Sequence, residues 1–158
     1  MKSIAPIVVG LFAAVLLLSS CTSAPKVPLG VKADAIIKDD IVGRWEGDWG
    51  TMYLKAVGNG VRGIYTYEDG RVIGTFANGK FKGWWSESPD REPPDSAGVV
   101  EFTFLRSEGG GISLDGRWKY GNDPAEEWNE DWDLDWSGGD IPADIDADFV
   151  KDEDFPQY

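Results

Sequence analysis

The chain has 158 residues, enough for one domain with a targeting segment, and it contains eight Trp, 20 Gly and nine Pro but no His. The absence of histidine excludes Ser-His-Asp or Cys-His catalysis of the usual kind and imidazole metal ligation. Of the 28 acidic residues behind the net charge of −13, 14 follow Asn122, where Lys151 alone opposes them. The remainder is balanced in charge, which argues against nucleic-acid binding, because that function normally leaves a basic footprint.

The first 20 residues have the pattern of an export signal. Lys2 precedes an apolar stretch over residues 7–18, which is shorter than the roughly 20 residues of a membrane span. The stretch ends in Leu18-Ser19-Ser20-Cys21, and these four residues resemble the lipobox of bacterial lipoproteins. The resemblance implies cleavage before Cys21, acylation of its thiol, and a lipid anchor in the membrane. The alternative is an ordinary secreted protein with a cysteine near its cleavage site.

The same resemblance bears on localisation. Thr22 stands where an aspartate would favour retention in the inner membrane of a Gram-negative cell, so we expect a lipid-anchored envelope protein in the outer membrane. Residues 21–40 carry Pro25, Pro28 and Gly30 without a clear period, and they read as a lipidated tether. The domain is then expected over 41–137.

One short pattern recurs five times in that domain: an apolar residue, glycine two positions later, and an aromatic two positions after the glycine. In a strand these three positions share a face, so each repeat puts a ring on one side and mostly polar spacers on the other. Glycines inside strands mark bends and close approaches, which predicts a small curved sheet around an aromatic core. The repeats centre on Gly43, Gly63, Gly74, Gly83 and Gly116.

Turn signals such as Asn78-Gly79 separate short strand patterns about every ten residues. We therefore predict an all-β domain, a single antiparallel eight-stranded meander, closed into a barrel because closure removes exposed edges. An open sandwich is the alternative. The expected strands cover residues 41–48, 51–57, 61–67, 71–77, 81–86, 98–106, 112–120 and 128–136.

The stretch from residue 41 to 87 resembles the first half of avidin and streptavidin, and the likeness extends to the Gly116–Trp118 strand. It also resembles uncharacterised bacterial domains with Gly-x-aromatic strands. The avidin resemblance implies a ligand-binding barrel, with Thr51 as a hydroxyl donor and Tyr65 beside the ligand. Gly47 replaces the asparagine of that site, so biotin itself is not the expected ligand. The candidate ligand-binding residues are Trp45, Thr51, Tyr65, Trp84 and Trp118.

The last expected strand alternates Asp131, Asp133 and Asp135 with apolar residues. Carboxylates attract Ca²⁺, but Trp136 stands where an EF-hand loop needs glycine, so we predict no metal site and a solvated acidic face. Residues 138–158 are dense in charge and predict a disordered acidic tail. The loose helical spacing of their apolar residues leaves open a short amphipathic turn or a partner-binding strip.

Two function classes follow for the domain. The first is a structural or interaction role in the envelope, with the membrane and an envelope protein as partners. The second is a barrel that binds a small apolar or sugar-like ligand in an aromatic-lined cavity. An enzyme is not expected, because the acidic candidates (Glu46, Asp48, Glu101 and Glu130) show no spacing that singles out a catalytic pair, and no cofactor is predicted.

Overall fold

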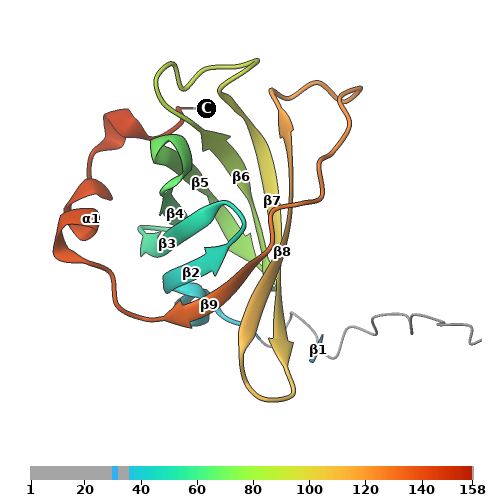
Figure 1. Cartoon of the computed structure of the whole chain (residues 1–158), viewed down its shortest axis with the longest axis vertical. Helices are drawn as coiled ribbons and strands as arrows, with labels where there is room; N and C mark the ends of the chain where they lie inside the picture. The colour runs from blue at the N-terminus through green and yellow to red at the C-terminus, as the bar shows by residue number, and fades with distance from the viewer. Residues whose placement is uncertain (1–29, 32–35, 158) are drawn as a thin grey trace, which may run out of the picture.

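The computed structural model describes residues 30–31 and 36–157. Each strand from β2 to β9 pairs antiparallel with the next, and β9 pairs back to β2, so the eight strands close into a barrel (Figure 1). This confirms the predicted closed antiparallel meander over the open sandwich. The strands are β2 (Gly43–Gly47), β3 (Gly50–Val57), β4 (Gly60–Tyr65), β5 (Gly70–Ala77), β6 (Lys80–Ser86), β7 (Ala97–Ser107), β8 (Ile112–Tyr120) and β9 (Leu134–Gly138).

The barrel interior is filled by side chains from every strand. Alternate positions along each strand point inward, so the aromatic ends of four of the five Gly-x-aromatic repeats enter one interior cluster. We call this set the interior cluster; it consists of Ile36, Ile41, Trp45, Met52, Leu54, Val61, Tyr65, Val72, Phe81, Trp85, Val100, Phe102, Phe104, Leu114, Trp118, Trp132 and Leu134.

Rings occupy the space that two glycines leave free. A Cβ on Gly70 would lie 1.9 Å from the Tyr65 ring, and a Cβ on Gly116 would lie 2.9 Å from the Phe102 ring. Any larger residue at either position would have to displace a buried ring, which explains why glycine is placed inside these strands. Of the five repeat glycines, Gly116 is the one with a ring at this place; a Cβ on Gly74 or Gly83 would meet backbone instead.

The last strand begins later than its pattern predicts, at Leu134 rather than Trp128. Residues 122–133 run beside β8, where Asn129 and Trp118 form an isolated bridge and the Trp132 backbone N–H donates to the Gly116 carbonyl at 3.3 Å. The reason is local packing: Trp132 turns into the interior cluster and is 2% exposed, whereas Asp131 and Asp133 face solvent. The regular ladder with β2 begins two residues beyond this indole, where Leu134 pairs with Gly47.

The two ends of the barrel differ. One is covered by the short 3-10 helix η2 (Lys38–Ile41), whose Ile41 joins the interior cluster together with Ile36. Residues 36–40, expected as part of the tether, therefore belong to the packed domain. At the other end, the mouth, β2, β4, β6 and β8 end. The connections there include η3 (Tyr67–Asp69) and the long loop over residues 87–96.

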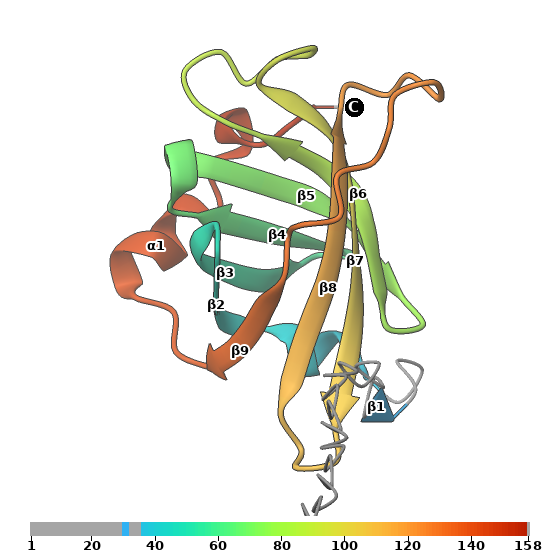
Figure 2. The same cartoon turned by 45° about the vertical axis from the view of Figure 1, so that its right-hand side comes forward.

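The tail is folded in its described part, 138–157, which corrects the expectation of disorder. Helix α1 (Ala143–Asp148) and the 3-10 turn η4 (Asp152–Asp154) lie outside the barrel beside β3 and β4 (Figure 2). We call the contact the outer cluster; it contains the buried Ile64, Phe149 and Phe155 with the partly buried Tyr53, Ile73, Ile141 and Ile145. The apolar residues with loose helical spacing are those that make this contact.

Basic strand residues explain why so acidic a segment stays on the barrel. The Arg62 guanidinium donates to the Phe149 carbonyl at 2.7 Å and to the Asp152 carboxylate at 2.6 Å, and it lies 4.6 Å from the Phe155 ring centre. Lys55 forms an ion pair with Asp146. Opposite charges thus flank the apolar contact on both sides.

Strand β1 (Gly30–Val31) pairs with the end of β7 at Arg106 and Ser107. The predicted signal peptide and Cys21 lie outside the described residues.

Candidate functional site

Three of the candidate residues, Trp45, Tyr65 and Trp118, belong to the interior cluster, and the first two are the more deeply buried. Trp45 is fully buried, its indole N–H donates to the Ile41 carbonyl at 3.0 Å, and its ring meets Phe104 edge-on at 5.3 Å. Tyr65 is 1% exposed, and its ring lies 5.0 Å from that of Trp132. Both rings are therefore held on several sides by other side chains.

Thr51 does not join them. It lies opposite Glu46 in the β2–β3 ladder, and its hydroxyl donates to the Glu46 carboxylate at 2.9 Å. The next residue, Met52, points into the interior, so Thr51 and Tyr65 face opposite sides of the sheet. The avidin resemblance would place these two residues in one site, and the structure separates them.

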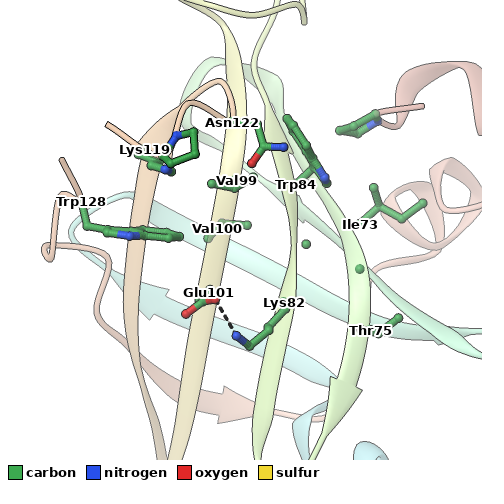
Figure 3. A pocket seen from close by; sticks show the side chains of 14 residues that line it. Ile73, Thr75, Lys82, Trp84, Val99, Val100, Glu101, Lys119, Asn122 and Trp128 are labelled. Carbon is green, nitrogen blue, oxygen red and sulfur yellow. Dashed lines mark hydrogen bonds and ion pairs between the residues drawn. The ribbon is translucent and has the colours of Figure 1, made fainter. Parts of the chain in front are cut away.

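Trp84 lines a groove on the outside of the barrel, over β5 to β8. We call this hollow of about 620 Å³ the outer groove (Figure 3). Trp84 and Trp128 lie on opposite sides of β7, with Val99 between them, and Asn122 closes the upper end in this view. Gly74 and Gly83 pair with each other and line the groove with backbone alone.

Charged side chains occupy the lower end of the outer groove. The Glu101 carboxylate accepts from Lys82 at 2.7 Å and from Arg117 at 2.6 Å. Burial alone would raise the pKa of Glu101, but these two cations overcome it and hold the pKa below its ordinary value. The Arg117 guanidinium also lies 4.4 Å from the Trp128 ring centre, which fixes that indole at the groove edge.

Trp118 lies at the mouth of the barrel, in a second hollow of about 200 Å³ that we call the mouth cup. The turn between β2 and β3, η3, the start of the long loop and the end of β8 all contribute to it, because alternate connections of a meander meet at the same end. Its wall consists of Trp49, Tyr67, Glu68, Trp85, Glu87, Asp95, Trp118 and Tyr120.

Glu87 is the buried carboxylate of the mouth cup. It is 9% exposed and accepts a hydrogen bond from the Tyr65 hydroxyl at 2.8 Å. Burial raises the pKa of Glu87, the neighbouring charge of Glu68 acts in the same direction, and the Tyr65 hydrogen bond opposes both. Burial, followed by the Glu87 charge, raises the pKa of Tyr65 well above its usual value.

Of the residues that line these two hollows, the candidate ligand-binding residues from the sequence include Trp84 and Trp118. The prediction from the sequence missed the acidic residues of the mouth cup and, in the outer groove, Trp128 and Asn122. A usable signal was present, because Trp49, Tyr67, Glu87 and Tyr120 all lie at or just beyond the ends of alternate strands in a predicted meander.

No helix in the described part of the chain is long and apolar enough to cross a membrane. Comparisons of the chain with protein-family models, with curated proteins and with solved structures find no match.

Proposed function

We propose that this chain is a lipid-anchored protein of the cell envelope whose barrel serves as an interaction module, with the outer groove as the surface that binds a glycan of the envelope. The lipobox resemblance at Leu18–Cys21 supports the anchor. Helix α1, the interior cluster and the ion pairs on the outer strands support a rigid domain rather than one that opens.

The observation that carries the glycan is the pairing of two indoles with polar groups in one groove. Trp84 and Trp128 border it, and Asn122, Glu101 and two lysines line the space between and around them. Aromatic surfaces beside a few fixed polar groups suit a polyhydroxylated ring, because they cover its C–H face and bond its hydroxyls. At about 620 Å³, the groove has room for more than one sugar residue.

The alternative of a ligand inside the barrel has less support. Such a ligand would have to displace rings such as Trp45 and Phe104, which pack edge to face within the interior cluster. The proposal assigns no catalysis: Glu46 is bonded to Thr51 and paired with Arg44, and Glu101 is bonded to Lys82 and Arg117.

The groove is tested by calorimetry of the full chain with soluble fragments of envelope glycan. We expect saturable binding that Trp128→Ala weakens about tenfold, as loss of a stacking surface would (roughly 1–2 kcal/mol). Trp136→Ala is the matched control, because Trp136 is 40% exposed and lines a different hollow. Absence of glycan binding, together with cross-links from the groove to an envelope protein, would replace the glycan with a protein partner.

The anchor is tested separately with Cys21→Ser. We expect the variant to lose labelling by radioactive palmitate and to leave the membrane fraction on a carbonate wash, since several acyl chains make a stable anchor. A variant that stays in the washed membranes would overturn the lipid anchor without touching the groove.

A further inference from the structure

Five aromatic residues lie in the wall of the mouth cup, beside its three carboxylates. The rings of Tyr67, Trp49 and Trp118 follow one another with centroids 5.1 and 5.5 Å apart and planes at 83° and 82°. Trp85 and Tyr120 continue the series beside Trp118, at 88° and 80° to it. Because each ring is nearly perpendicular to its neighbour, the rings surround a space instead of forming a parallel stack.

The indole N–H groups of the mouth cup already donate hydrogen bonds within the protein. Trp49 donates to the Asp131 carbonyl at 3.0 Å, Trp118 to the Asp131 carboxylate at 2.8 Å, and Trp85 to the Lys119 carbonyl at 3.1 Å. The Trp132 N–H has no partner, but it is buried and does not line the cup. The cup therefore offers a ligand aromatic rings and carboxylates in preference to indole N–H groups.

The remaining lining groups carry negative charge. Glu68, Glu87 and Asp95 line the cup, no Lys or Arg does, and within residues 36–157 none of the three carboxylates forms an ion pair. The nearby Arg91 donates through Nη2 to the Asp69 carboxylate at 2.6 Å and to the Asp69 carbonyl at 2.9 Å, whereas its buried Nη1 has no hydrogen-bond partner among the described residues. Glu87 is the most deeply placed of the three, and one of its oxygens accepts only from Tyr65.

We propose that the mouth cup binds a small organic cation of the alkylammonium class. Ring faces attract a cation through their quadrupoles, and the attraction is strongest where water is excluded. The carboxylates supply the countercharge, and the volume of about 200 Å³ fits a single head group rather than a polymer. The charge of a cation beside Glu87 would also offset the cost of burial and the repulsion from Glu68, which both disfavour the ionised carboxylate.

An organic cation fits better than a metal ion. In the described residues, no three His, Cys, Asp or Glu side chains gather closely enough to hold a metal, so the cup carboxylates are spread around an aromatic wall. Metal ions need several oxygens in one shell, whereas an alkylammonium distributes its contacts over rings and single carboxylates.

The test is calorimetry of the full chain with choline, with n-butylammonium and with 3,3-dimethylbutan-1-ol, the neutral isostere of choline. We expect one saturable site for a cation and binding at least tenfold weaker for the neutral isostere. Preference for choline would indicate a free quaternary ammonium as the natural ligand. Preference for n-butylammonium would indicate a lysine side chain of a partner protein. Equal binding of choline and its neutral isostere would overturn the proposal, as would binding of Ca²⁺ in place of both cations.

Two variants locate the site. Glu87→Gln keeps the shape and the Tyr65 contact but removes the charge, and Tyr67→Leu removes one exposed ring; each should weaken cation binding about tenfold. Their matched controls, Glu108→Gln and Trp136→Leu, are exposed and lie outside the cup, so they should leave binding unchanged. Because Tyr67 is 46% exposed, its variant keeps the test decisive if Glu87→Gln alters the fold. Full cation affinity in both cup variants would rule out the cup as the site.

Discussion

The interior cluster and the outer cluster lie on opposite faces of the same strands, but they are assembled in different ways. The interior cluster takes residues from all eight strands, whereas the outer cluster pairs three strand residues with a segment at least 68 positions further along the chain. In β4, Gly63 and Tyr65 face inward while Ile64 between them faces out. The closed interior is shielded by the sheet itself, and the outer contact lasts only while the tail is docked.

This difference is visible in the exceptions to the repeated pattern. Five of the ten spacers around its glycines are charged, and among these Arg44, Lys82 and Arg117 form ion pairs on the outer face. Ile64 and Ile73 are apolar spacers, and the tail covers both. The other two apolar spacers, Val42 and Trp84, line hollows on the outer surface, so an apolar residue at an outward position marks either a surface that another segment covers or a hollow.

The largest effect is expected from breaking the interior. Phe102→Ala removes a fully buried ring that packs on Phe81 and Trp132, so it should lower the free energy of unfolding by about 3–5 kcal/mol. Denaturant titration measures the loss, and Phe102→Leu should cost clearly less. A loss below about 1 kcal/mol would mean that the interior is less tightly packed than described.

A smaller loss is expected from the outer cluster. Phe149→Ala should cost about 2 kcal/mol, because the tail can undock instead of leaving an enclosed cavity. Hydrogen exchange should show faster exchange over residues 141–157 with little change in β7. Val150→Ala is the control, since Val150 is 74% exposed and should behave as wild type. Equal acceleration in the barrel strands would show that tail and barrel unfold together.

The hydrogen bonds and ion pair between Arg62 and the tail should contribute less again to the free energy of unfolding. Arg62→Met keeps much of the apolar stem but removes the bonds to Phe149 and Asp152, for an expected loss of about 1–2 kcal/mol that shrinks in high salt. Arg44→Met provides the comparison, because the Arg44 side chain is half exposed and should change stability little. If both variants lose the same free energy of unfolding, the Arg62 contacts make no specific contribution to docking of the tail.

The smallest effects concern the dependence of stability on pH. This dependence should have opposite signs for Glu87 at the mouth and for Glu101 on the outer face. The raised pKa of Glu87 means that its contribution to stability is present below the ordinary glutamate pKa and is lost as pH rises through the folded value. The lowered pKa of Glu101 means that its contribution is present above the ordinary value and is lost as pH falls through the folded one.

Relative to wild type, Glu87→Gln should therefore gain stability as pH rises. Glu101→Gln should be less stable at neutral pH, by about 0.5–1 kcal/mol, and approach wild type in acid. Unfolding curves between pH 3 and 8 compare the two. If stability relative to wild type changed with pH in the same direction in both variants, the environments assigned to Glu87 and Glu101 would be wrong.

The candidate sites were less predictable than the strands. Trp118 and Trp84 were both selected for their aromatic rings, yet one lies at the mouth cup and the other on the outer groove. Their partners, Glu87 and Asn122, follow strands or sit in loops, where no periodicity tells which side chains converge. Which neighbours a loop residue meets depends on barrel closure and on loop paths, and these are long-range properties.

By itself, the sequence determined the all-β class, most strand boundaries and the inward face of each repeat, because alternation and turn chemistry act over a few residues. It also determined the acidic charge of the tail. Only the tertiary structure decided that this tail is ordered, since burial of Phe149 and Phe155 depends on Ile64 and Arg62 far away in the chain. The same holds for the mouth cup, whose rings and carboxylates become neighbours only when β9 pairs with β2 and closes the barrel.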